Sequence, residues 1–199
     1  MNYIQKIIEI SKDLVKVIQI ILKEKKINDQ NFKIIINNFK EIEPLLLEVV
    51  CSAFLIRLVS LYQEILEALR KEKTLFHNFP SINEKRQLDK EQHKEWIEKL
   101  ITKPEISENI KKMSINKIVF NDENLRFLLV LKEEECSREF NLIYFGEFSE
   151  KILHFRKKRN DNSHNYQIVH NISYDDFIEV LIWMIFLCMI LDEYNNLIK

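Results

Sequence analysis

A single glycine, Gly146, is the feature that most constrains the fold of this 199-residue chain. A phosphate-binding P-loop or a dinucleotide-binding turn needs several glycines where the backbone approaches the ligand, so the sequence excludes both. Folds with many β-strands also use Gly and Pro in their turns, and the chain has only three prolines. Because helix interiors need neither residue, the sequence predicts an all-α or mostly α protein.

The charged residues nearly cancel, since 30 Lys and Arg stand against 31 Asp and Glu. Any contact with nucleic acid must therefore come from a local basic patch. The three cysteines match neither a disulfide framework nor a zinc-binding spacing. Cys51 and Cys188 lie in apolar stretches, where a free cysteine behaves as a small hydrophobe. We expect no cofactor and no bound metal.

The N-terminal residues do not have the pattern of a secretory signal, because Lys6 and Glu9 interrupt the apolar positions. The most apolar run, residues 180–191, is too short to span a bilayer and is typical of a buried core helix. These features predict a protein of the reducing cytoplasm that has no membrane partner.

Helical spacing of apolar residues dominates residues 1–73. An amphipathic helix is predicted from Ile4 to Leu22, and Pro44 suits the first turn of a helix reaching about residue 73. Apolar residues surround this last helix on most sides, so we expect it to be central. Between these two predicted helices, a short helix after Asn28 should bury four side chains, namely Phe32, Ile35, Ile36 and Phe39.

Residues 74–147 differ in pattern and are expected to form an insertion. Its apolar runs are short, and turn-forming residues at 121–124 separate the first two; the runs cover residues 117–120, 125–131 and 140–145. They favour a small β meander, although residues 125–138 fit a helix equally well. We therefore expect one domain over residues 1–199, with a helical core from residues 1–73 and 148–199.

Two C-terminal helices are predicted around a polar connection. Ser149 can cap a short helix that ends near Asn160. Ser173 opens the last helix and has Asp176 three residues later, as in a capping box with Asp in place of Glu. Ile172 and Phe177 have the spacing of a hydrophobic staple.

Residues 159–166, at this connection, read Arg-Asn-Asp-Asn-Ser-His-Asn-Tyr. Five residues separate Arg159 from His164, so the two side chains converge only if the helix ends between them. The intervening Asn, Asp and Ser residues are those that end helices. Arg binds phosphate through two hydrogen bonds and His exchanges protons near neutral pH, so the pair suits metal-free cleavage of a phosphodiester.

The pattern resembles the HEPN superfamily (higher eukaryotes and prokaryotes nucleotide-binding), whose signature is Arg, four to six residues and then His. Arg159, Asn160 and His164 match this signature, and Tyr166 extends the match to the Arg-x4-His-x-Tyr form. That form is known in toxins paired with a minimal nucleotidyltransferase antitoxin, in which the Tyr is AMPylated. The resemblance implies an up-and-down helical bundle.

The resemblance also implies a metal-independent endoribonuclease in a toxin or phage-defence role, acting on tRNA or single-stranded RNA. Its products carry a 2′,3′-cyclic phosphate and a 5′-hydroxyl. Arg159, Asn160 and His164 would be the catalytic residues. Three basic side chains just before them would bind RNA, namely Arg156, Lys157 and Lys158. A homodimer that pairs two motifs across a two-fold axis is expected, with an antitoxin or another defence protein as a further partner.

Other interpretations remain open. The basic residues 156–159 also fit a solvated helix end that complements the helix dipole. Tyr166 suits packing or substrate contact as well as modification. For the whole domain, the alternatives are a catalytically silent HEPN module that binds RNA, nucleotide or a protein partner, and a helical scaffold without a nucleic-acid role.

Overall fold

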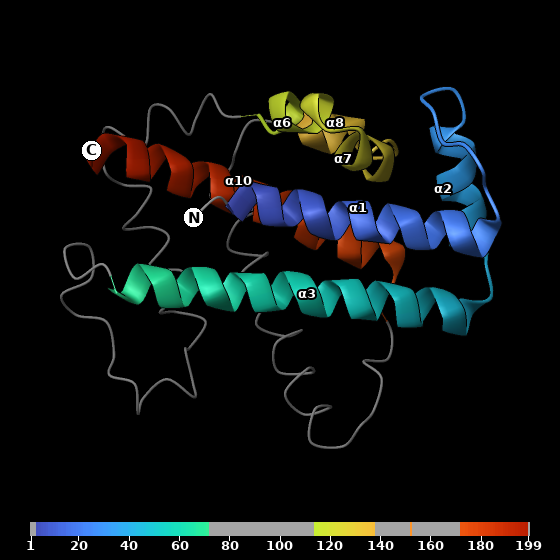
Figure 1. Ribbon diagram of the computed structural model, residues 1–199, viewed down its shortest axis with the longest axis horizontal. Coiled ribbons are helices and arrows are strands. Elements are labelled where there is room, and N and C mark those ends of the chain that lie inside the picture. Colours follow the sequence, from blue (N-terminus) through green and yellow to red (C-terminus); the bar gives the residue numbers. More distant parts are fainter. Residues whose placement is uncertain (1–2, 72–113, 138–151, 153–171, 199) are drawn as a thin grey trace, which may run out of the picture.

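The computed structural model describes residues 3–71, 114–137, 152 and 172–198. Throughout these ranges the regular structure is α-helical and contains no β-strand, so the predicted mostly α fold is confirmed. Within the described residues there are three long helices: α1 (Tyr3–Leu22), α3 (Pro44–Lys71) and α10 (Tyr174–Ile198). They pack against one another and lie side by side, with α1 running opposite to α3 and α10 (Figure 1).

The core is centred on α10, which has buried side chains on all of its faces between Phe177 and Leu191. The apolar run predicted to be a buried helix is therefore confirmed as one. The expectation that α3 is central is only partly right. One face of α3 packs on α10 and α1, but Ala53 and Arg57 on its other face are exposed.

The N-terminal helices follow the predicted pattern closely. α1 buries one side, including Ile7, Leu14 and Ile18, and Pro44 is the first residue of α3. The short helix α2 (Phe32–Lys40) joins them and buries the four side chains that were predicted to face inward. The amphipathic pattern predicted for α1 and α2 is thus confirmed.

Part of α3 is long and apolar enough to cross a membrane by length and composition, over Pro44–Ile65. Half of this stretch is buried inside the molecule. A core helix of a soluble protein passes the same test, so the feature is weak evidence for a membrane span.

The predicted β meander is wrong where the structure describes it. Residues 117–120 belong to α6 (Asn116–Asn121), and residues 125–131 to α7 (Glu123–Leu128) and the connection that leads to α8 (Glu133–Ser137). Asp122, which was interpreted as part of a strand-connecting turn, caps α7, because its Oδ1 accepts from the amides of Asn124 (3.0 Å) and Leu125 (2.9 Å). Short apolar runs have too few residues to distinguish the two periods. Residues 140–145 lie outside the described ranges.

The capping box at the start of α10 is confirmed. The Ser173 amide donates to Asp176 Oδ2 at 3.0 Å, and the Asp176 amide donates to Ser173 Oγ at 3.1 Å. Ile172 and Phe177 are both buried, as a hydrophobic staple requires. The final helix therefore begins where the sequence predicts.

The three cysteines are buried packing residues. Burial, with a smaller effect of Asp176, raises the pKa of Cys51 to about 12. Burial, with a smaller effect of Glu135, raises the pKa of Cys136 to about 12. Burial also raises the pKa of Cys188. Because the thiolate is the reactive form, these side chains are inert as nucleophiles in the folded protein.

The first prediction concerns the C-terminal end of α1, where a lysine takes the position at which helices usually have glycine. Lys23 follows α1 with φ of 55°, a left-handed conformation in which its Cβ is strained. Its amide and that of Glu24 close a Schellman motif by donating to the carbonyls of Ile20 (3.3 Å) and Gln19 (3.0 Å). We expect Lys23→Gly to raise the free energy of unfolding, measured by urea denaturation, by up to about 1 kcal/mol.

The matched control is Lys25→Gly, at an exposed lysine two residues later whose φ is not positive. This change should leave stability unchanged or lower it, because glycine only adds freedom to the unfolded chain there. A lower stability for Lys23→Gly than for Lys25→Gly would contradict the strained helix end.

A second prediction concerns the thiols. In the native protein at pH 8, the three cysteines should react with Ellman's reagent on the order of 100-fold more slowly than a free thiol, because burial suppresses the thiolate. In guanidinium chloride, all three should react rapidly. One rapidly titrating thiol in the native protein would show that a cysteine is accessible and would contradict the burial.

Candidate functional site

The site predicted from the sequence falls in one stretch of the chain, residues 153–171, that lies outside the described residues. This holds for every residue that was assigned a role: Arg156, Lys157, Lys158, Arg159, Asn160, His164 and Tyr166. The structure describes the residues on both sides of this stretch, and these define its attachment to the fold.

Both flanking residues belong to the hydrophobic core. Ile152 is helical and has 0% of its surface exposed, which agrees with the predicted helix after Ser149. Ile172, just before the capping box, is 3% exposed. Buried residues therefore stand on both sides of the stretch that contains the candidate segment, residues 156–166.

The anchor on the C-terminal side is extended by Tyr174, the first residue of α10. Its hydroxyl donates to the carbonyl of Leu128 at 2.9 Å, at the end of α7. Its ring meets the Phe39 ring edge-on, with 5.9 Å between the centroids. Burial raises the pKa of Tyr174 well above its ordinary value, so the phenol remains a neutral donor. Tyr174 thereby joins α10 to both α2 and α7.

Charged side chains surround the same helix start. Asp175 Oδ2 lies 3.0 Å from Lys40 Nζ on α2, and its Oδ1 lies 4.0 Å from Lys132 Nζ, just before α8. A carboxylate in the first turn of a helix also interacts favourably with the helix dipole. These partly exposed pairs add little stability, but they orient α10 relative to α2 and the α7–α8 connection.

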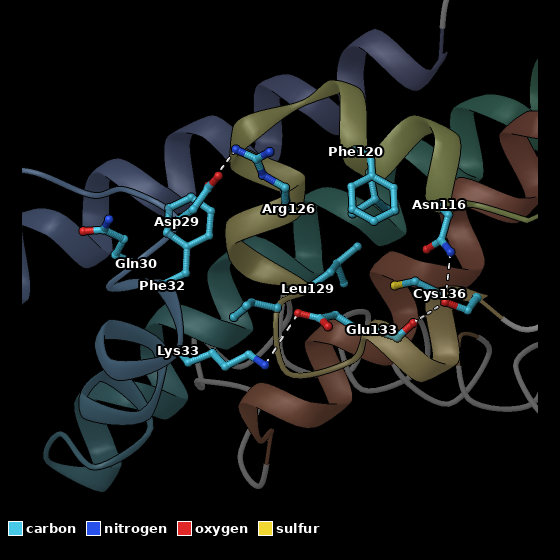
Figure 2. Close-up of a pocket in the computed structure, with 13 residues that line it drawn as sticks. Asp29, Gln30, Phe32, Lys33, Asn116, Phe120, Arg126, Leu129, Glu133 and Cys136 are labelled. Atoms are coloured by element: carbon cyan, nitrogen blue, oxygen red, sulfur yellow. Dashed lines mark hydrogen bonds and ion pairs between the residues drawn. The ribbon is translucent and has the colours of Figure 1, made fainter.

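A cavity of about 370 Å³ lies between α2 and the three short helices (Figure 2). Phe32 and Lys33 of α2 line one wall, and Leu129 and Val130 of the α7–α8 connection line another. Phe120 of α6 is 65% exposed at this cavity. In Figure 1, α6, α7 and α8 lie on the opposite side of α1 from α3, so the cavity is on the outer side of the bundle.

Polar contacts hold the cavity walls together. Arg126 Nη2 donates to Asp29 Oδ1 at 2.6 Å, which joins α7 to the chain before α2. At another wall, Asn116 Nδ2 donates to Ser137 Oγ at 2.9 Å, joining α6 to α8. The walls are therefore linked by side chains from segments far apart in the sequence (Figure 2).

Sequence reasoning did not identify Phe120, Arg126 or Asn116 as members of one site. The favoured β meander placed Phe120 and Arg126 in strands, which is the wrong local geometry, although a helix over residues 125–138 fitted the pattern equally well. Asn116 lies just before these runs. No spacing in the sequence pairs residue 126 with residue 29, so this contact is visible only after α2 and α7 have packed.

In the described ranges there is no group of three or more His, Cys, Asp or Glu side chains placed to hold a metal ion. The chain matches no protein-family model, no curated protein and no solved structure. Its function therefore has to be inferred from its own residues.

Proposed function

We propose that this protein is a metal-independent endoribonuclease of the HEPN type, with a role as a toxin or in phage defence. The observation that carries the proposal is the pattern Arg159-Asn160-x3-His164-x-Tyr166, which precedes the last helix of a mostly α chain by a few residues. The capped start of α10 at Ser173 supports it, because the last helix begins after the motif and does not include it.

In the proposed reaction, the ribose 2′-hydroxyl attacks the adjacent phosphorus. A histidine takes the proton from this hydroxyl as the bond from O2′ to phosphorus forms. The bond from phosphorus to O5′ breaks, and a protonated histidine delivers a proton to the leaving oxygen. The products are a 2′,3′-cyclic phosphate and a 5′-hydroxyl. His164 is assigned this proton transfer, which typically contributes 10²–10⁴-fold to the rate.

Two further residues act on the phosphate in this proposal. Arg159 stabilises the charge that develops on the phosphorane-like transition state, because its guanidinium stays protonated and binds two oxygens at once. Asn160 orients the pair or hydrogen-bonds the phosphate. Arg156, Lys157 and Lys158 hold the RNA backbone by charge, which matters in a protein of net charge −1.

The direct test is cleavage of total tRNA with and without EDTA. The wild-type protein should cut RNA equally well in both, and His164→Ala should lower the rate by about 10²–10⁴-fold. His170→Ala is the matched control, since His170 lies close in sequence but outside the motif, and it should keep the activity. End mapping should find cyclic phosphates.

Four outcomes separate the proposal from its alternatives. Cleavage that requires a divalent metal, or a wild-type protein that leaves all RNA intact, contradicts the nuclease. RNA binding that survives His164→Ala, with no turnover in either protein, instead identifies a silent binding module. Loss of RNA binding in Arg159→Ala, with binding retained in the exposed Arg57→Ala control, argues against a scaffold without a nucleic-acid role.

A separate prediction concerns assembly. One motif supplies one histidine, whereas the reaction removes one proton and delivers another, so we propose an isologous homodimer that pairs two copies of residues 156–166. Arg159→Ala and His164→Ala proteins should each be weak alone. After subunit exchange, roughly half of the dimers contain both variants and so have one Arg159 and one His164 in the composite site. Because one histidine can transfer the two protons in turn, these dimers should regain part of the activity.

Sedimentation velocity should show the dimer, and high salt should lower the activity because it screens contacts with the RNA backbone. A protein that is monomeric and fully active would overturn the composite site. Verified exchange without any gain in cleavage would do the same.

A further inference from the structure

We propose that the cavity between α2 and α6–α8 binds a small, uncharged, planar aromatic molecule that carries an amide-like group. This inference goes beyond the proposed nuclease and does not depend on it, because the cavity is built entirely from described residues outside the candidate segment. Its size, its aromatic rim, its polar groups and its charge balance all point to this class.

Size sets the first limit. A volume of about 370 Å³ is near the lower end of the range for small-molecule sites, which begins at about 300 Å³. It is more than twice the roughly 150 Å³ that accommodates one benzene ring, so it has room for one or two rings with short substituents. Much of the lining is apolar, including Val119, Leu129 and Val130, so a flat hydrophobic body gains free energy by leaving water there.

The aromatic rim favours a planar ligand. Phe120 is 65% exposed, although a large aromatic side chain normally gains from burial. Figure 2 shows its ring between Arg126 and Asn116. The second aromatic residue, Phe32, is already engaged, by the Phe127 ring at 5.1 Å and by the Arg126 guanidinium at 5.8 Å. Phe120 is therefore the ring that remains open to stack on a ligand.

Two polar side chains can form hydrogen bonds with an amide group. Arg126 carries five N–H donors, of which Nη2 donates to Asp29. Its Nε is buried, but the side chain as a whole is 36% exposed and lines the cavity, so a ligand would be bound by the Nη donors. The guanidinium can therefore donate to a further carbonyl and keep its pair with Asp29. Asn116 uses its Nδ2 to reach Ser137, which leaves its carbonyl oxygen as an acceptor for a ligand N–H.

The charges of the lining residues cancel. Lys33 and Arg126 are cations, Asp29 and Glu133 are anions, and all four line the cavity. Arg126 Nη2 lies 2.6 Å from Asp29 Oδ1, and Lys33 Nζ lies 3.7 Å from Glu133 Oε1, so each cation is paired with an anion. An anionic ligand would meet the two carboxylates, and a cationic one would meet the two basic groups. An uncharged ligand avoids both penalties.

Benzamide is the probe for this class, because it joins one ring to a carbonyl acceptor and an N–H donor. Titration into the full-length protein by ligand-observed NMR should give saturable binding with Kd of about 1 mM, typical for so small a molecule. Benzoate and benzylamine test charge, and cyclohexanecarboxamide tests the ring. Each of the three should bind at least about 5-fold more weakly.

Two variants tie the binding to the cavity. Phe120→Ala should weaken benzamide binding at least about 5-fold through loss of stacking. Arg126→Lys keeps the charge beside Asp29 but removes the planar donors, and should weaken it by about 5-fold. The matched control is Ile34→Ala, which removes another exposed apolar side chain (61% exposed) on α2 outside the lining and should leave Kd unchanged.

Circular dichroism and the unfolding midpoint check that each variant folds. Because Phe120 is largely exposed, its truncation should leave the fold intact, so weaker binding by Phe120→Ala reports on the cavity. No saturable binding of benzamide up to 10 mM, on the order of ten times the expected Kd, would overturn the site. Equal binding by Phe120→Ala would overturn the stacking role. Tighter binding of benzoate or benzylamine would overturn the uncharged class.

Discussion

Burial of α10 is the constraint on which the rest of the structure depends. This helix is apolar on all faces over most of its length, so it must be enclosed, and α1 and α3 enclose it in the described part of the molecule. α1 in turn supports α7 and α2. The short helices owe their positions to these contacts, because helices of five or six residues are not stable alone in water.

The start of α10 links this core to the proposed nuclease. Ser173 and Asp176 satisfy the first amides of the helix, and Tyr174 joins it to α2 and α7. Buried Ile152 and Ile172 stand at the two sides of residues 153–171. The proposed nuclease would benefit from such attachment, since catalytic groups need fixed supports to reach productive geometry.

The end of α7 and the α7–α8 connection contact both the start of α10 and the cavity. Leu129 and Val130 line the cavity, Leu128 accepts the Tyr174 hydroxyl, and Lys132 lies 4.0 Å from Asp175. One short stretch, residues 128–132, therefore contacts the start of α10 and also forms a wall of the cavity.

The sequence alone determined the helical class, the bounds of the long helices and the cap of α10, because periodicity, Pro44 and the Ser173–Asp176 pair act over a few neighbouring residues. It also determined the inert burial of Cys51 and Cys188. Only the tertiary structure decided that residues 116–137 form helices and that Arg126 pairs with Asp29. Runs of four to seven apolar residues suit either period, and contacts between distant segments exist only once those segments pack.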